Sequence, residues 1–261
     1  MGNGTVTGRS SAVLQVVKQP AEETLLQRFD RYFEVVQANT PERLKQAHAI
    51  RYRVYCLETG FENASQNAGG LEKDTYDAHA IHGLLIHRNS RVAVGTVRLV
   101  LPLAEDPERS FAVQAVSDHP AVRNSTAFPI RTTAEISRFC ISREFRRRAS
   151  DTLYDQEGTE PTPANDPSER RSGPLMRLGL MQAIVRMSVA HGMTHWCAVM
   201  EPKLLRMLEA MAIRFTPLGS RVNYHGLRQP CMGNIKDVLN AVRKQRPAFW
   251  EVLTCGGALQ Y

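Results

Sequence analysis

The sequence predicts an α/β (α+β) protein built on a mixed, mostly antiparallel sheet that is flanked by helices. First, predicted strands come in sequence with helices inserted between them, which favours this class over a helical bundle or an all-β sandwich. Second, no G-x-G-x-x-G follows a predicted strand and no P-loop is present, which disfavours a doubly wound nucleotide-binding fold. Third, 43% apolar and 23% charged residues over 261 positions are typical of a globular protein with a sizeable core.

The first part of the chain has the apolar periodicity of regular elements. Thr40 and Pro41 match the N-cap and first position of a helix. A loop is predicted where Gly69 and Gly70 follow a polar stretch. The predicted elements are a short helix at 22–31, a strand at 32–38, a helix from 40 to about 58, a loop at 61–76 and a strand–turn–strand hairpin at 79–87 and 91–101.

Prolines exclude long regular elements from residues 102–133, and regular periodicity resumes after them. The helix predicted near the middle of this part is apolar on nearly all sides, so we expect it to be buried. The predicted elements are a strand at 134–141, a helix at 175–190, a strand at 194–200, a helix from Pro202, one or two strands within 215–231, and a helix at 235–254 interrupted at Pro247.

Two segments lack the pattern of a packed element. Residues 1–20 are rich in Gly, Ser and Thr and predict a flexible tail. Residues 149–173 are polar and rich in Pro, Asp, Glu and Ser, which predicts a mobile insertion. We therefore expect a single domain over residues 21–261 that carries this insertion.

The N-terminus does not have the pattern of a secretory signal, and no run of eighteen apolar residues occurs. These observations favour a cytoplasmic protein with at most peripheral membrane contact. The five cysteines form no C-x-x-C pair, which predicts reduced, buried thiols rather than a disulfide framework or a zinc site. No metal is expected.

The net charge of +7 suits an acidic partner, either nucleic acid, anionic lipid or an acidic carrier protein. Proteins that bind single-stranded nucleic acid interleave exposed aromatic residues with basic ones. Here the aromatic residues fall mostly in predicted strands and helices, so nucleic acid is disfavoured as the partner.

Charged residues inside predicted strands mark the candidate site. Arg98 interrupts an apolar strand face, and it either reaches solvent near the strand end or is a buried guanidinium that holds a carboxylate. Glu135 and Arg138 are three residues apart, which places them on opposite faces of a regular strand. Either one of them faces solvent, or a β-bulge re-aims it.

Three acidic residues, Glu72, Asp74 and Asp77, precede the predicted hairpin. Acidic residues in loops usually face water, but a buried Arg98 would need counter-charges, and these three could provide them. Arg51 and Tyr55 lie one helical turn apart in the preceding helix. They represent either part of the same site or an aromatic core contact beside a surface arginine.

The order and spacing of these residues resemble the signature of acyl-homoserine-lactone synthases. That signature begins with R-x-x-x-aromatic, followed after five further residues by a second aromatic residue. An E-x-D-x-x-D motif, an arginine in a strand and an E-x-x-R motif come after it. Those synthases usually have Phe and Trp where this chain has Tyr55 and Phe61. The matching positions are Arg51, Tyr55, Phe61, Glu72, Asp74, Asp77, Arg98, Glu135 and Arg138.

Longer stretches resemble a related branch, the PEP-CTERM/exosortase-associated acyltransferases, which are similar to long-chain N-acyl amino acid synthases. These stretches include RYRVYCLETGFEN, AEISRFCISREFRRR and THWCAVMEPKLLR, and the resemblance covers about residues 30–255. It implies the fold of the GCN5-related N-acetyltransferases (GNAT), a mixed splayed sheet. Acyl-phosphopantetheine would lie in the V between strands 134–141 and 194–200.

The resemblance implies an N-acyltransferase that moves a long-chain fatty acyl group from an acyl carrier protein to the amine of an amino acid. Glu135 would be the base, and Arg98 and Arg138 would bind or orient the acceptor. Many such enzymes keep an acid that protonates the leaving thiolate at the start of the helix that corresponds to 202–212, but this chain has no tyrosine there. Tyr224 or His225 is the candidate substitute. The remaining signature residues would bind substrate, and no permanent cofactor is expected.

Acyl carrier protein is favoured over acyl-CoA as the donor, because the insertion at 149–173 replaces the Gly-rich pyrophosphate loop of acetyl-CoA enzymes. A solvated basic loop is the alternative interpretation of the arginines there. The arginines predicted to dock the carrier are Arg143, Arg146, Arg147, Arg148, Arg170 and Arg171.

Other functions remain open. An acyl-homoserine-lactone synthase would use S-adenosylmethionine as acceptor, and a non-catalytic carrier-binding protein would not need Glu135. Met176, Leu180 and Met187 either line an acyl tunnel or belong to the plain core.

Overall fold

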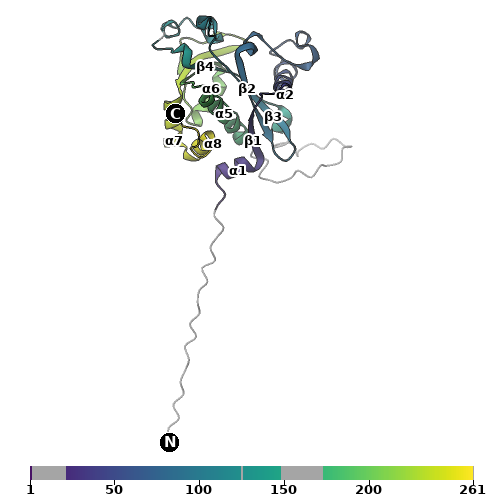
Figure 1. Cartoon of the computed structure of the whole chain (residues 1–261), viewed down its shortest axis with the longest axis vertical. Coiled ribbons are helices and arrows are strands. Elements are labelled where there is room, and N and C mark those ends of the chain that lie inside the picture. The colour runs from purple at the N-terminus through teal and green to yellow at the C-terminus, as the bar shows by residue number, and fades with distance from the viewer. Residues whose placement is uncertain (2–21, 125, 148–172, 261) are drawn as a thin grey trace.

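A computed structural model describes residue 1 and residues 22–124, 126–147 and 173–260 (Figure 1). Within these residues, strands pair in the order β1-β2-β3-β4-β5-β8-β6, and β7 pairs with β8. The strands are β1 (Phe33–Gln37), β2 (Ala80–His87), β3 (Val92–Val100), β4 (Thr133–Ile141), β5 (His195–Met200), β6 (Thr216–Pro217), β7 (Val222–Asn223) and β8 (Leu227–Asn234).

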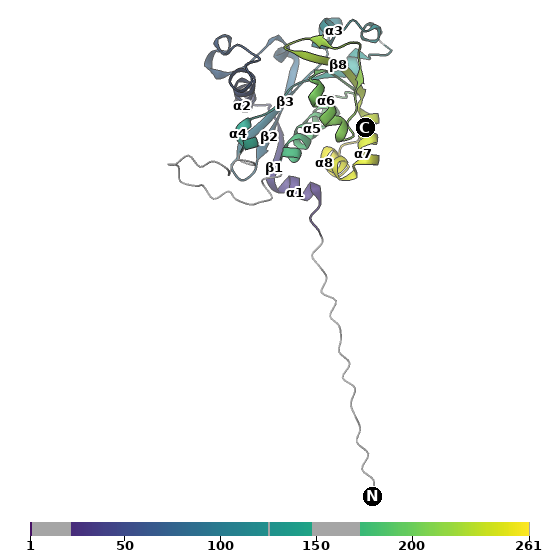
Figure 2. The same cartoon turned by 180° about the vertical axis from the view of Figure 1, so that it is seen from behind.

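Helices cover both faces of this sheet (Figures 1 and 2). Helix α2 packs on β2, β3 and β4 from one side, and α5 packs on β1, β2, β3 and β4 from the other. The helices are α1 (Leu25–Tyr32), α2 (Pro41–Arg51), α3 (Ala112–Val116), α4 (Arg143–Arg147), α5 (Gly173–Ala190), α6 (Pro202–Ala210), α7 (Ile235–Gln245) and α8 (Pro247–Thr254).

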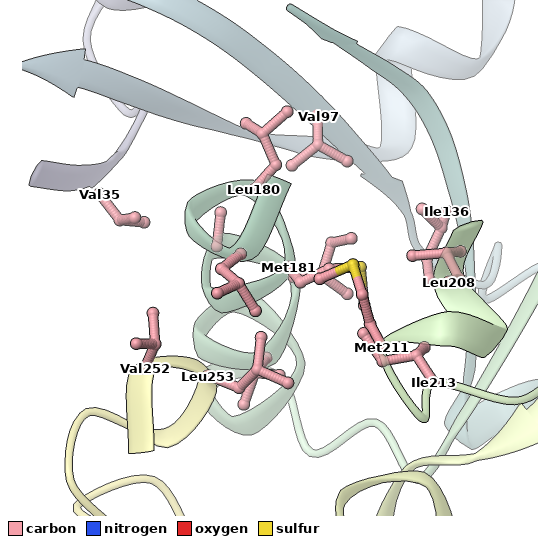
Figure 3. Close-up of a cluster of buried hydrophobic side chains, with 14 of the residues drawn as sticks. Val35, Val97, Ile136, Leu180, Met181, Leu208, Met211, Ile213, Val252 and Leu253 are labelled. Atoms are coloured by element: carbon pink, nitrogen blue, oxygen red, sulfur yellow. The ribbon is translucent and has the colours of Figure 1, made fainter. Parts of the chain in front are cut away.

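The pleat of β2 divides the core between the two layers. Leu84 and Ile86 pack with Ile50 on the α2 side, whereas Leu85 packs with α5 because neighbouring strand residues point to opposite faces. Figure 3 shows apolar side chains gathered around α5, among them Leu180. The buried helix that the sequence predicts is therefore confirmed, and the core it forms includes Met176, Leu180 and Met187.

Helix α5 approaches the sheet closely at Gly83. A Cβ built on Gly83 would lie 2.7 Å from the Cβ of Ala183 in α5, a separation that packed atoms do not adopt. Because the Ala183 Cβ is fixed to the helix backbone, no side-chain rotation relieves this contact. Gly83 therefore sets how near the helix sits to the strands.

Two predicted elements differ from the structure. The helix expected from residue 40 to about 58 is α-helical only to Arg51, and Tyr52–Glu58 form a π-helix. Thr59 is the last residue of this pattern: its N–H makes the final bond of the π-helix, to the carbonyl of Val54, and its hydroxyl donates to the same carbonyl. Residues 215–231, expected to hold one or two strands, contribute to three, β6, β7 and β8.

Strand β4 contains the bulge that the spacing of Glu135 and Arg138 suggested. Arg98 pairs with Ser137, but Thr96 pairs with Cys140, so one extra residue of β4 is accommodated between these pairs. Arg138 has a φ of +50°, in the left-handed region that residues with a Cβ rarely adopt. The extra residue changes which face the following side chains point to.

Strands β4 and β5 form the one parallel pair among the strands described, and they separate soon after they meet. They pair only at residues 133–135 of β4 and 195–197 of β5. Beyond that point β5 continues to pair with β8, and β4 continues to pair with β3. The splayed strands predicted at 134–141 and 194–200 are thus confirmed.

All five cysteines lie in described segments as free thiols. Cys56, Cys140, Cys197 and Cys231 are buried, and Cys255 is half-buried. No helix in the described ranges has the length and apolar character that crossing a membrane requires. The predicted tail at 1–20 and nearly all of the predicted insertion at 149–173 lie outside the described residues.

Candidate active site

Three arginines from three separate elements meet on the α2 side of the sheet. Arg51 comes from the end of α2, Arg98 from β3 and Arg138 from the bulge of β4. The arginines are joined by loop carboxylates, and we call this set the ion-pair cluster. Its members are Arg51, Arg98, Arg138, Glu62, Glu72, Asp74 and Asp77.

Arg51 is completely buried, so the interpretation that it is a surface arginine is wrong. Its Nη1 and Nη2 donate to the two carboxylate oxygens of Asp77 at 2.6 and 3.1 Å. Its Nε donates to Glu72 Oε2 at 2.5 Å. Such a two-pronged arrangement holds the planar guanidinium in one orientation.

Arg98 is 2% exposed and is held by the loop acids, as the sequence suggested. Its Nη1 donates to Asp74 Oδ1 and to Asp77 Oδ1 at 2.5 and 2.8 Å. Its Nε donates to Ser137 Oγ at 2.9 Å, and its guanidinium carbon lies 5.7 Å from the centre of the Tyr76 ring.

Arg138 completes the ion-pair cluster because the bulge turns its side chain toward the loop acids. Its Nη2 donates to Glu72 and Asp74, both at 2.9 Å, and to Glu62 at 3.3 Å. Its guanidinium carbon lies 5.4 Å from the centre of the Tyr55 ring, a distance suited to a cation–π contact.

The cluster stabilises its carboxylates in the charged form. Burial acts to raise the pKa of Glu72, but hydrogen bonds from Arg51 and Arg138 outweigh it and lower the pKa to about 2. Burial likewise opposes ionisation of Asp77, yet hydrogen bonding to Arg51 brings its pKa well below the ordinary value. With three arginines and four carboxylates, the cluster has a net charge of −1.

Glu135 lies near the ion-pair cluster but does not join its ion pairs. The residue is 3% exposed, and its Oε2 accepts a hydrogen bond from the N–H of Val113 at 2.8 Å. Burial raises the pKa of Glu135 to about 7, against the opposing effects of the Val113 hydrogen bond and the Arg98 charge. A pKa near neutral pH is the property that suits a general base.

A cleft of about 640 Å³ opens where β4 and β5 separate. Glu135, Arg98 and Arg138 lie in its wall, so the bulge brings both residues of the E-x-x-R motif into one cavity. Another part of the wall, on α5, β5 and α6, is mostly apolar. Its apolar residues on β5, α5, α6 and the segment after α6 are Met181, Val199, Met200, Leu204, Met207, Leu208 and Phe215.

Tyr55 and Phe61 also lie in the cleft wall, at and just beyond the π-helix. The Phe61 ring lies 5.4 Å from the guanidinium carbon of Arg228 at the start of β8. This contact joins two segments of the cleft wall that are distant in sequence. Of the substrate-binding residues predicted from the sequence, only Tyr55 and Phe61 line the cleft. The other four belong to the ion-pair cluster and do not line it: Arg51, Glu72, Asp74 and Asp77.

The hairpin between β7 and β8 places two further polar side chains in the cleft wall, Tyr224 and His225. Their rings stack edge to face with centres 4.9 Å apart. Burial raises the pKa of Tyr224, and the negative charge of Glu135 raises it further. Met176, Leu180 and Met187 belong to the core and do not line the cleft.

Among the described residues, His48, Asp77 and His82 form a group whose potential metal-ligand atoms lie within 4.8 Å of one another. Asp77 already accepts hydrogen bonds from Arg51 and Arg98. Burial, and then the charge of Arg51, lowers the pKa of His82 to about 3. A divalent cation would meet the same repulsion from these guanidinium groups, so this donor set does not suit a metal.

The predicted carrier-docking arginines are only partly described. Arg143 is exposed, its N–H donates to Glu58 and its Nε lies 3.9 Å from a Glu58 oxygen. The side chains of Arg146 and Arg147 lie outside what the structure describes. So do residues Arg148, Arg170 and Arg171.

Some residues of the site were missed by the sequence reasoning. Glu62 joins the ion-pair cluster and Ser137 holds Arg98, but each stands beside a motif residue without any pattern of its own. Tyr76 and Arg228 come to the site only through folding, because Tyr76 packs against Arg98 and Arg228 packs against Phe61, and neither pair is close in sequence.

The architecture matches known proteins. Residues 50–155 match the family model of the acetyltransferase (GNAT) domain. The crystal structure of TofI in a ternary complex with an inhibitor and MTA is similar, with a TM-score of 0.54 and 20% identity over 84% of this chain and 99% of that one. The chain has a GNAT-like fold.

Two further solved structures share this fold. The CoA-dependent acyl-homoserine lactone synthase BjaI, with SAM and isopentyl-CoA, has a TM-score of 0.52 and 19% identity over 82% of this chain and 88% of that one. FeeM, an N-acyl amino acid synthase from uncultured soil microbes, has a TM-score of 0.51 and 14% identity over 82% and 97%. No curated protein matches the sequence.

Proposed function

We propose that the protein is an N-acyltransferase that transfers a long-chain fatty acyl group from a carrier-protein thioester to the amine of an amino acid. The observation that supports this most is Glu135, a buried carboxyl with a pKa near 7, in the wall of a cleft between splayed strands. FeeM, which shares the fold, is an N-acyl amino acid synthase. The resemblance to PEP-CTERM/exosortase-associated acyltransferases points to the same reaction.

In the proposed reaction, the acceptor nitrogen attacks the thioester carbonyl, a C–N bond forms and the C–S bond breaks. Glu135 accepts the proton that the nitrogen loses, directly or through a water molecule. The leaving thiolate takes a proton, for which Tyr224 in the cleft wall is the proposed donor. N–H groups at the β4 bulge are the proposed partners of the developing oxyanion.

The apolar wall supports a fatty acyl donor. Met181, Met207 and Phe215 provide flexible and aromatic surface along one side of the cleft, and methionine side chains adapt to irregular apolar ligands. We propose acyl carrier protein as the source of the acyl group because of the arginines around residues 143–171, of which Arg143 is exposed in the structure. Acyl-CoA is the alternative donor.

The second candidate is an acyl-homoserine-lactone synthase. Glu135 and Glu62, a member of the ion-pair cluster, line the same cleft. The net negative charge of that cluster favours a cationic acceptor such as the sulfonium of S-adenosylmethionine. TofI was crystallised with MTA and BjaI with SAM. Product mass separates a lactone from an N-acyl amino acid.

The test is a reaction of purified protein with a long-chain acyl-carrier thioester or acyl-CoA and a panel of amino acids, with products identified by mass spectrometry. The expected result is an N-acyl amino acid, with a rate that rises with pH around an apparent pKa of about 7. Glu135→Gln is expected to lower the rate about 10²–10⁴-fold. The matched control is Glu209→Gln, an exposed acid on α6 outside the cleft.

A wild-type protein that acylates no amine from either donor would contradict the proposal. Equal rates for the wild type and Glu135→Gln would remove Glu135 from the mechanism. Transfer to S-adenosylmethionine alone would select the second candidate.

A further inference from the structure

The cleft contains an arginine that the ion-pair cluster does not use. Arg228, at the start of β8, lines the cleft, and only 13% of its side chain is exposed. The one hydrogen bond of its side chain within the described residues runs from Nη1 to the carbonyl of Leu227 at 3.1 Å. Its one ion-pair partner there is Glu201, an acid 43% exposed, at 3.5 Å. Arg228 is thus largely withdrawn from water with most of its donors unused.

The other arginines near the site are differently placed. Nε of Arg98 and of Arg138 donates to protein oxygens, and both side chains hold two or more carboxylates. An incoming carboxylate would have to displace these contacts, and it would meet the net charge of −1 on the ion-pair cluster. Arg98 and Arg138 are therefore poor receptors for a second carboxylate.

Arg177 and Lys203 also line the cleft, but they belong to its apolar side. Arg177 stands one helical turn before Met181 on α5, and Lys203 stands one turn before Met207 on α6. This position places both cations along the surface proposed for the fatty acyl chain. They are poorly placed to bind the small acceptor.

Arg228 shares its hairpin with Tyr224, and that residue lies close enough to Glu135 for the carboxylate to raise the pKa of its phenol. The ring of Phe61, which also lines the cleft, packs against the guanidinium. The hairpin therefore places Arg228 in the wall of the same cleft as Glu135, the proposed base. An α-amino acid has its carboxylate one carbon away from its amine, so both groups can be bound within one small space.

We propose that Arg228 binds the carboxylate of the acceptor amino acid while Glu135 receives the proton from its amine. This inference rests on the proposed function and adds the residue that selects a free amino acid over other amines. Guanidinium binds carboxylate through paired N–H donors, which is the geometry that a planar fork with unused donors offers.

The experiment compares two acceptors that differ only in the carboxylate, a free amino acid and its methyl ester, with one acyl donor. Arg228→Gln is expected to raise the KM for the free acid about 10–100-fold, from the loss of a hydrogen-bonded charge partner. The KM values for the ester and for the donor are expected to stay within about twofold, a difference too small to represent a lost charge pair. Arg228→Lys keeps the charge without the fork and is expected to be intermediate.

Arg221→Gln is the matched control, because Arg221 is an exposed arginine close to the same hairpin and does not line the cleft. It is expected to leave both acceptors unaffected. Circular dichroism and thermal unfolding show whether each variant is folded. An equal loss for acid and ester in Arg228→Gln, or no loss for either, would overturn the assignment.

The two proposals fail in different ways. If the wild type acylates amines but the acid-to-ester preference is the same in Arg228→Gln, only the role of Arg228 is wrong. If no donor gives product, the proposed function fails. Calorimetric titration of the free amino acid into wild type and into Arg228→Gln then decides whether Arg228 binds carboxylate. Weaker binding to the variant than to the wild type would support the assignment. Equal binding to both proteins, or binding to neither, would contradict it.

Discussion

Glu72 provides a direct test of how the ion-pair cluster stabilises the fold. Its side chain is 2% exposed, and its carboxylate bridges Arg51 and Arg138. Glu72→Gln keeps the shape and one acceptor oxygen but removes the charge. The buried guanidinium of Arg51 and the half-buried one of Arg138 then lose a counter-charge, and the loss of a partner from a buried pair typically costs about 3–5 kcal/mol.

The pKa gives an independent magnitude for the same contact. The pKa of Glu72 falls from 4.5 to about 2 on folding. At about 1.4 kcal/mol for each pKa unit, this fall corresponds to a contribution of about 3 kcal/mol to the free energy of unfolding. The pKa is depressed in the folded state, so this contribution is fully present above pH 4.5. It is lost as the pH falls from about 4.5 toward about 2.

The assay is urea unfolding of wild type and Glu72→Gln at pH 7 and at several lower pH values, with the m-value checked for constancy. We expect the variant to be about 3 kcal/mol less stable at pH 7, with a difference that narrows on acidification. Glu144→Gln is the control, because the Arg53–Glu144 pair is about half exposed and should contribute less than about 1 kcal/mol. A difference of under about 1 kcal/mol for Glu72→Gln, or one independent of pH, would refute the reasoning.

Three further predictions follow from the structure. Gly83→Ala should destabilise the protein by about 1–3 kcal/mol in urea unfolding, because the added Cβ would meet the fixed Cβ of Ala183 at 2.7 Å; unchanged stability would show that α5 and β2 are not packed this closely. Alkylation of native protein followed by mass spectrometry should modify Cys255 alone, because the other four thiols are buried, and rapid labelling of Cys140 would contradict the described core. Arg51→Lys should destabilise the fold although the charge is kept, because lysine cannot reproduce the paired contact with Asp77; unfolding midpoints equal to wild type would contradict that geometry.

The sequence predicted much of the ion-pair cluster because its residues are anomalies. Arg98 interrupts the apolar face of one predicted strand, and Glu135 and Arg138 interrupt a second apolar strand. Charges at such positions indicate either solvent exposure or a buried partner. The spacing of the latter pair suggested a bulge, and the structure places Arg138 in a left-handed conformation there. Polar residues at positions that periodicity assigns to the core are strong local signals.

The remaining parts depend on geometry that one-dimensional patterns do not contain. The apolar spacing of residues 44–57 fits an α-helix, and only the structure shows that the turns widen to a π-helix from Tyr52. Arg228 carries no anomaly in sequence, since an arginine in a short polar hairpin is usual. Its importance arises from its contact with Phe61, which is 167 positions away in the sequence and becomes a neighbour only in the folded chain.

The most direct test of the proposed function is a product measurement. Purified protein is incubated with a long-chain acyl-carrier thioester and a free amino acid, and the products are identified by mass spectrometry. We predict an N-acyl amino acid from the wild type and about 10²–10⁴-fold less from Glu135→Gln. A wild-type reaction without any acylated amine from either the carrier thioester or acyl-CoA would contradict the account.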